Sequence, residues 1–335
     1  MKYKLTIVTT TYNHEKFIEE ALNGFVNQKT TFPFQVLISD DCSTDNTAKI
    51  IRKYQKKYPN IIKPIFRKKN LGPMENFIET LNEVHTTYVA LCDGDDYWTD
   101  ENKLQKQVDF LDKNKNYTIC FHQTEIFYEA DKNKKELCYP KNVKDTTDFN
   151  DLIKECYIPA NSVVYRWQFL KPNSFKKKFP KNIVPGDYYV HLLHASNGKI
   201  KFISEVMSKY RKHEDGMWWA ATDETQKSKF YLKYGIKYIN FFESVEKEFK
   251  LKKDTFEYTK KYLIENTFAC LINEKKWKEI ELLDNQYGEI ITNYVKKIRT
   301  EPVYHNFTKF KRIMYYLLFE PKTFKNKVLS KLKKI

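Results

Sequence analysis

The sequence predicts an α/β fold in which a mainly parallel sheet is flanked by helices and followed by a C-terminal helical region. Two observations predict it. Short β-branched runs alternate with helical stretches in the first part of the chain, which is typical of βαβ units. From about Thr225 helical periodicity takes over, with only Gly235 before Gly288. We therefore treat residues 225–335 as a separate helical region.

Strand–helix pairs make up the first part of the chain. Each apolar run is followed by apolar residues at helical spacing. The expected strands are Lys4–Thr10, Phe34–Asp40, Ile61–Phe66 and Tyr88–Asp93, and the expected helices are His14–Gln28, Asn46–Tyr58, Pro73–Val84 and Glu101–Asn114. Pro73 suits a first helical turn, and Thr44 or Asp45 is the expected N-cap of the second helix.

Further strands and one more helix follow. The expected strands are Tyr117–Tyr128, Asn161–Arg166 and Lys199–Arg211, with a helix over Asp187–Ser196. No G-x-G-x-x-G follows the first strand, which argues against a dinucleotide-binding Rossmann enzyme.

Composition narrows the class of protein. The 335 residues are 41% hydrophobic and 16% aromatic, which suffices for a large core. The formal net charge of +16 favours an anionic partner such as nucleic acid, a phosphorylated substrate or a membrane surface, although composition alone favours a solvated lysine surface as its explanation. The six cysteines lack a C-x-x-C pair, so we expect reduced core thiols in a cytosolic protein.

The sequence contains no apolar run long enough for a membrane span. The run at Ile313–Phe319 is far too short, and the apolar run near the N-terminus is too short for a signal peptide. We therefore expect a cytoplasmic protein that is soluble or lies on a membrane surface.

An acidic cluster, Asp93, Asp95 and Asp96, follows the fourth strand. Ligands of open α/β sheets bind beyond the carboxyl ends of the strands. Paired carboxylates there can hold a hard divalent cation, which in turn holds a diphosphate. A turn with an aspartate helix cap explains the cluster as well. Acidic residues also follow the second strand, at Asp40 and Asp41, and such loops should meet at one edge of the sheet.

Several segments occur in a recognisable order: VTTTYNHEKFIEEAL, ISDDCSTDNT, KNLGPMENF, ALCDGDDYWTDENKLQKQVDFL, CFH and PGDYYVHLLHASNGKIKFISEVMSKYRKHEDGMWW. This order resembles bacterial glycosyltransferases of family 2 over about the first two thirds of the chain, ending near Trp219. The resemblance implies the Rossmann-like GT-A fold, a nucleotide-diphosphate sugar donor and inversion of the anomeric centre. It also implies a donor half at residues 1–98 and an acceptor half at residues 99–224.

The resemblance implies which residues hold the nucleobase. The first loop supplies Thr11, Tyr12 and Asn13, and the second supplies Asp41, while Asp40 is structural. A carboxylate that accepts the N3 proton of uracil favours uridine over cytidine, whose N3 carries no proton. An ordinary βα loop, in which Tyr12 packs and Asn13 caps, remains the alternative.

The rest of the donor site follows from the same resemblance. Asn70 and Asn76 match residues that contact the donor in the family. The alternatives are that Asn70 belongs to a tight turn and that Asn76 lies on a helix face. Asp93 approaches the ribose or the metal ion, Asp95 binds Mn²⁺ or Mg²⁺, and Asp96 fixes the loop or caps the next helix.

The catalytic base implied by the resemblance is Asp187, at the start of a helix on the acceptor side. A single carboxylate would take the proton of the acceptor hydroxyl, and a helix N-cap is a compatible role. Arg211 and His213 would face the diphosphate, with His213 also a metal ligand; surface positions are the alternative. The segment Met217–Ala220 departs from the family pattern, which leaves the last contact of that loop open.

The C-terminal segment Phe307–Ile335 combines aromatic residues, leucines and many lysines. A basic amphipathic helix of this kind can lie on an anionic membrane surface. Such an anchor would suit lipid-linked glycan acceptors, and packing on its own domain is the alternative.

The sequence thus predicts a metal-dependent inverting glycosyltransferase that uses a UDP-sugar and a glycan or lipid-linked glycan acceptor in bacterial surface polysaccharide assembly. It would be cytoplasmic, with peripheral contact to the inner face of the cell membrane left open. A sugar nucleotidyltransferase is disfavoured because the first loop has no glycine to cradle a triphosphate. A nucleic-acid-binding protein is disfavoured because the strand-end loops are acidic, so we expect no nucleic-acid partner.

Overall fold

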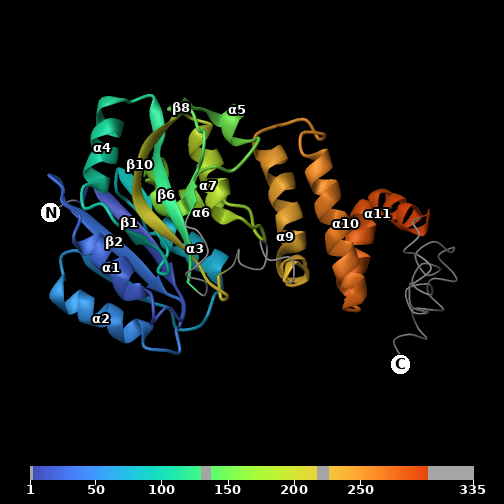
Figure 1. Cartoon of the computed structure of the whole chain (residues 1–335), viewed down its shortest axis with the longest axis horizontal. Helices are drawn as coiled ribbons and strands as arrows, with labels where there is room; N and C mark the ends of the chain where they lie inside the picture. Colours follow the sequence, from blue (N-terminus) through green and yellow to red (C-terminus); the bar gives the residue numbers. More distant parts are fainter. Residues whose placement is uncertain (1–2, 130–136, 217–225, 301–335) are drawn as a thin grey trace. The chain divides into compact units, whose positions relative to one another are not determined.

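The computed structural model describes residues 3–129, 137–216 and 226–300, with the side chains given up to residue 296. The chain forms two compact units, Met1–Thr222 and Asp223–Ile335, which Figure 1 colours along the sequence. The predicted boundary after residue 224 lies close to this division. The split of the first unit into donor and acceptor halves stays a prediction.

The described residues of the first unit form a ten-stranded sheet in the order β3-β2-β1-β4-β9-β6-β10-β5, with β7 beside β6 and β8 beside β10. Its first half is parallel and comprises β1 (Leu5–Thr11), β2 (Phe34–Asp40), β3 (Ile62–Phe66) and β4 (Tyr88–Leu91). These strands follow the apolar runs of the sequence, and every residue of β4 is buried, as expected for a parallel sheet covered on both faces.

The second half of the sheet is mixed. It comprises β5 (Tyr97–Trp98), β6 (Tyr117–Tyr128), β7 (Leu137–Tyr139), β8 (Thr146–Thr147), β9 (Val164–Arg166) and β10 (Lys199–Lys212). Strand β9 runs antiparallel to both β4 and β6, and β10 runs parallel to β6. Strands β1, β4, β6 and β10 therefore share one direction, so their carboxyl ends meet at one edge of the sheet.

Helices cover both faces of this sheet (Figure 1). One face carries α1 (Ile18–Val26), α2 (Thr47–Lys57) and α4 (Lys103–Lys113), whose apolar residues pack on β1, β2 and β4 in the largest core cluster. The other face carries α3 (Pro73–Asn82), α6 (Ser174–Lys178) and α7 (Gly186–Ala195). A short helix, α5 (Phe149–Leu152), and a 3₁₀ turn, η1 (Ala160–Ser162), complete the unit.

Three expected boundaries were wrong in ways that concern the site. Helix α1 begins at Ile18 and not at His14, because His14 begins a turn in which its backbone oxygen accepts from the amides of Phe17 and Ile18. The N-cap of α2 is Asn46, although the Asp45 carboxylate accepts from the Thr47 amide at 2.9 Å. Strand β9 starts at Val164 because η1 precedes it.

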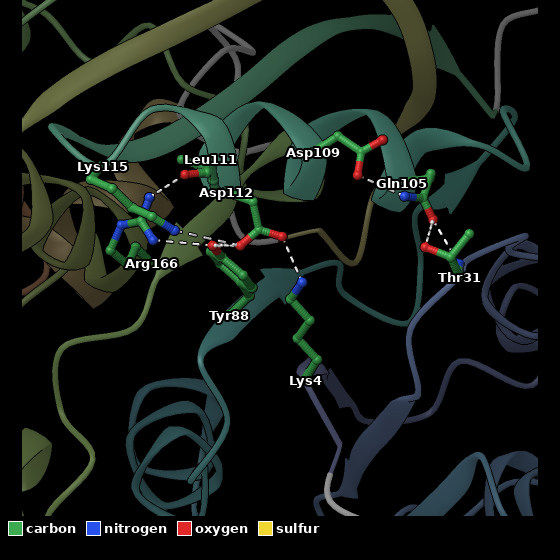
Figure 2. Close-up of polar contacts among 9 residues, drawn as sticks. All are labelled: Lys4, Thr31, Tyr88, Gln105, Asp109, Leu111, Asp112, Lys115 and Arg166. Carbon is green, nitrogen blue, oxygen red and sulfur yellow. Dashed lines mark hydrogen bonds and ion pairs between the residues drawn. The ribbon is translucent and has the colours of Figure 1, made fainter.

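A polar network ties α4 to the sheet (Figure 2). The Asp112 carboxylate accepts from Lys4 Nζ at 2.5 Å and from the Tyr88 hydroxyl at 2.7 Å. Arg166 donates to the same hydroxyl at 3.1 Å and to the backbone oxygen of Leu111. Lys4 precedes β1 and Tyr88 begins β4, so this network fixes the edge of the sheet opposite the carboxyl ends.

The described part of the second unit is helical, as predicted. It comprises α9 (Lys227–Glu248), α10 (Glu257–Asn273) and α11 (Trp277–Thr300), with α10 packed on both others. A Cβ on Gly235 would lie 2.2 Å from Thr267 Oγ1, so glycine is what allows α9 to approach α10. The segment Phe307–Ile335, for which the sequence predicts a membrane contact, lies outside the described residues.

The cysteine expectation holds in part. All six cysteines are free, but only Cys92 and Cys120 are buried, and Cys138 is exposed on the short strand β7. Within the described residues, no helix combines the length and the apolar character needed to cross a bilayer.

Candidate active site at the carboxyl ends of the strands

A pocket opens where the carboxyl ends of β1, β4 and β10 meet the start of α7. Its lining brings together polar residues that are far apart in the sequence: Thr10, Asp93, Asp95, Asp96, Asp187, Arg211 and His213. Apolar side chains of α3, including Met74 and Phe77, form one wall. The parallel sheet thus gathers the acidic cluster, the predicted base and the predicted histidine in one place.

The acidic loop is shaped by Gly94. A Cβ on Gly94 would lie 2.8 Å from both Ile18 Cδ1 and Thr11 Oγ1, so only glycine permits this close approach. The Asp93 carboxylate accepts from Thr10 Oγ1 at 2.7 Å. The Asp96 carboxylate accepts from the Arg211 amide at 2.8 Å, which joins the loop to β10.

Asp95 is flanked by two imidazoles. Its Oδ2 lies 3.1 Å from Nε2 of His213, which follows β10, and 3.9 Å from Nε2 of His14, which follows β1. Burial disfavours ionisation of Asp95, but the two histidines outweigh burial and hold the pKa of Asp95 below its usual value. Asp95 is therefore a carboxylate at neutral pH.

The neighbouring carboxyl groups behave in the opposite way. Enclosure by protein atoms and then the negative charge of Asp95 raise the pKa of Asp93 and of Asp96 above the usual range. This crowding of negative charge is what a divalent cation would relieve. Within the described part of the chain, no three metal-binding side chains form a ready cluster. Asp95 and His213 alone would therefore supply two ligands to a cation, and oxygens of a bound diphosphate and water would have to supply the others.

Asp187 stands in the first turn of α7 and lines the pocket. One oxygen of its carboxylate accepts from the Tyr188 amide at 2.9 Å. Burial raises the pKa of Asp187, while this hydrogen bond and that of its own amide oppose the shift. A carboxylate with a raised pKa in the lining of this pocket is suited to accept a proton.

Arg211 lines the pocket, and its predicted contact with a diphosphate stays a prediction. Arg211 is 6% exposed, and its guanidinium donates to Glu20, Glu129 and, through Nε, to the backbone oxygen of Asp95 at 2.8 Å. The same group stacks 4.5 Å from the ring centroid of Phe17. Two carboxylates and a carbonyl thus engage the guanidinium, and Arg211 holds the Asp95 loop in place.

The predicted nucleobase loop is present beside the pocket. Thr11 ends β1 and is buried, whereas Tyr12 is 43% exposed. Asn13 has a left-handed backbone, and its side-chain oxygen accepts from the Thr44 amide at 2.8 Å. Asn13 therefore joins the loops after β1 and β2.

Asp41 and Asn70 are tied to each other. The two Asp41 oxygens accept from the amides of Leu71 and Gly72 at 2.8 and 2.9 Å, and Asn70 Nδ2 donates to the Asp41 backbone oxygen at 3.1 Å. Asp41 is buried. A nucleobase contact from Asp41 or Asn70 stays a prediction. Asp41 would have to accept a hydrogen bond from the base in addition to those it accepts from the two backbone amides.

Asn76, for which a donor contact was predicted, lies inside the protein, and that contact stays a prediction. It is 1% exposed, and its side chain bonds to Ser39 and to Arg67 Nε inside the protein. Asn76 thus braces β2 against α3. In the other direction, no role was predicted for His14, although an imidazole in a strand-end loop opposite an acidic loop could have indicated one.

Residues 6–174 of this chain match the family model described as "Glycosyl transferase family 2". The chain belongs to glycosyltransferase family 2. An uncharacterized protein of Mycobacterium tuberculosis is 41% identical over 223 residues, which cover 67% of this chain and 63% of that protein. The chain therefore spans less than two thirds of the length of this family 2 relative.

Solved structures show that the fold is of the GT-A type, as predicted. The Staphylococcus aureus TarS 1–349 complex with UDP-GlcNAc has a TM-score of 0.53 at 20% identity and covers 87% of this chain and 89% of that chain. The mannosyltransferase PcManGT from Pyrobaculum calidifontis, in complex with GDP-Man and Mn²⁺, has a TM-score of 0.52 at 14% identity, with coverage of 95% and 86%. At these identities the likeness concerns the fold alone.

Proposed function

We propose that the protein is a metal-dependent inverting glycosyltransferase that transfers a sugar from a UDP-sugar to a glycan or lipid-linked glycan in bacterial surface polysaccharide assembly. One observation carries the proposal. The Asp95–His213 pair, suited to a cation and a diphosphate, and Asp187, suited to a base, line the same pocket at the carboxyl ends of the strands.

The proposed chemistry assigns one step to Asp187. Its carboxylate takes the proton of the acceptor hydroxyl while that oxygen forms a bond to the anomeric carbon, and the bond from that carbon to the diphosphate oxygen breaks. The configuration at the anomeric carbon is thereby inverted, and the nucleoside diphosphate leaves. A bound Mn²⁺ or Mg²⁺ supplies positive charge that stabilises the leaving diphosphate.

The donor and acceptor classes are proposed from the loop after β1 and from the names of relatives. The exposed ring of Tyr12 beside Asn13 and Asp41 suits a nucleobase. A TarS protein of S. aureus, 25% identical over 64% of this chain, is named a poly(ribitol-phosphate) beta-N-acetylglucosaminyltransferase, and one solved TarS structure holds UDP-GlcNAc. These names favour a UDP-sugar and a surface polymer for this chain as well.

The test is nucleotide release from a panel of UDP-, GDP- and CDP-sugars in the presence of Mn²⁺. We expect slow hydrolysis of a UDP-sugar by the wild type and none by Asp95→Asn. A protein that binds no nucleotide sugar but is retained on filters with nucleic acid at physiological salt would instead be the basic nucleic-acid-binding protein that the net charge allows.

A further inference from the structure

Two imidazoles approach one carboxylate oxygen in the pocket. His213 reaches Asp95 Oδ2 from the end of β10, and His14 reaches the same atom from the loop after β1, at 3.1 and 3.9 Å. Both histidine side chains are largely enclosed, with 7% and 17% exposure. The three groups therefore converge although they come from three separate loops.

The local packing aims His14 at this point. The ring of Phe17 packs against His213 at 4.9 Å and against His14 at 6.3 Å between centroids, and the turn that begins at His14 places Phe17 there. Nδ1 of both histidines is buried without a hydrogen-bond partner among the described residues. The contact that the structure gives to each Nε2 is thus the one to Asp95.

We propose that His14 is a third protein ligand of the divalent cation, which completes a set of two imidazoles and one carboxylate with His213 and Asp95. This inference rests on the proposed function. Neighbouring ligands of an octahedral ion lie about 3 Å apart, since each stands about 2.1 Å from the metal. The His213–Asp95 separation of 3.1 Å meets this value, and the His14–Asp95 separation of 3.9 Å exceeds it by about 1 Å, so His14 would have to move by that amount when the cation binds.

Such a ligand set has a consequence for metal choice. Two histidines and one carboxylate would leave other coordination positions of a first-row transition-metal ion open for further ligands, such as oxygens of the diphosphate. Mg²⁺ is a hard cation that prefers oxygen ligands. His14 therefore makes the site prefer Mn²⁺ over Mg²⁺.

The test measures metal binding and not turnover. Free Mn²⁺ is followed by electron paramagnetic resonance while the full chain is titrated in the presence of UDP, and Mg²⁺ affinity is obtained by competition. The variants are His14→Gln and His14→Asp, the second replacing nitrogen by a carboxylate oxygen. His85→Gln is the control, because His85 is an exposed histidine in the loop between α3 and β4. Melting temperatures show that each variant is folded.

We expect His14→Gln to weaken Mn²⁺ binding at least about tenfold and Mg²⁺ binding less, since even outer-shell partners change metal affinity about 10–100-fold. His14→Asp should recover cation binding with the preference moved toward Mg²⁺. Equal Mn²⁺ affinities of His14→Gln and His85→Gln, or equal losses for both metals, would overturn the assignment of His14 while the metal-dependent function stands. No Mn²⁺ binding by the wild type with UDP would overturn both.

Discussion

The proposed transfer depends on the carboxylate of Asp187, which acts as the base. Replacing it with asparagine keeps its size and removes its basicity, so transfer should fall by about two to four orders of magnitude. The metal and nucleotide contacts are intact in Asp187→Asn, so UDP affinity should be unchanged. Parallel measurement of UDP binding and sugar transfer on one preparation checks both. A matching loss of UDP affinity would place Asp187 in the donor site.

Because burial raises the pKa of Asp187, the base should lose its activity as the pH falls through a value above the ordinary range for aspartate. The acidic limb of the pH–rate profile reports this value. In Asp187→Glu the limb should move with the new carboxyl group. An unchanged limb would assign the titration to another group.

Gly94 is a residue whose role the sequence only partly reveals. Its Cβ position lies 2.8 Å from Thr11 Oγ1 and Ile18 Cδ1, so Gly94→Ala should destabilise the protein by about 1–3 kcal/mol through overpacking and weaken UDP binding by displacing the acidic loop. Gly288→Ala is the matched control, because its nearest atom is 3.7 Å away and alanine favours a helix. Urea denaturation and UDP titration of both variants decide it; equal stability of the two would show that the loop adapts.

The acidic cluster and Asp187 were predictable from sequence because their position after a strand or before a helix determines where they lie. Arg211 and Asn76 were not predictable in this way. Their partners, Glu20 and Glu129 for one and Ser39 and Arg67 for the other, become neighbours only in the folded chain.

At the level of elements, the long apolar strands and the amphipathic helices lie close to where the sequence predicts them, because each buries the apolar residues whose spacing predicted it. The strands β5, β7 and β8 were missed because runs of two or three residues carry no period; pairing with β10 or β6 is what makes them strands.

Helix α4 carries a buried lysine that should make stability depend on pH. Lys103 Nζ donates to Gln107 Oε1 at 2.8 Å and lies 4.0 Å from the Trp98 ring centroid, and burial lowers the pKa of Lys103 from 10.5 to about 7. Above about pH 7 the unfolded chain binds more protons at this site than the folded one, so the free energy of unfolding rises with pH until about pH 10.5.

We therefore expect the wild type to gain up to about 2 kcal/mol relative to Lys103→Met between about pH 7 and pH 9. Urea midpoints at both pH values measure this difference. Lys56→Met, at an exposed position of α2, should show no such change. A constant difference between wild type and Lys103→Met would mean that Lys103 keeps its proton when buried.

At the scale of the whole molecule, every residue that lines the pocket belongs to the unit Met1–Thr222. The C-terminal segment Phe307–Ile335 should therefore be dispensable for hydrolysis of a soluble donor. Its lysines and aromatic residues predict binding to a membrane surface, so deleting it should reduce co-sedimentation with anionic vesicles at low salt. A full-length protein that does not sediment with such vesicles would contradict the membrane role.

The central claim is that the pocket at the carboxyl ends of β1, β4 and β10 binds a nucleoside diphosphate through a divalent cation held by Asp95. Calorimetric titration of UDP in Mn²⁺ and in excess chelator tests it most directly. We predict binding in Mn²⁺, loss of binding in chelator and loss in Asp95→Asn, with Asp109→Asn on α4 behaving as the wild type. Full UDP affinity in chelator, or in Asp95→Asn, would contradict the claim.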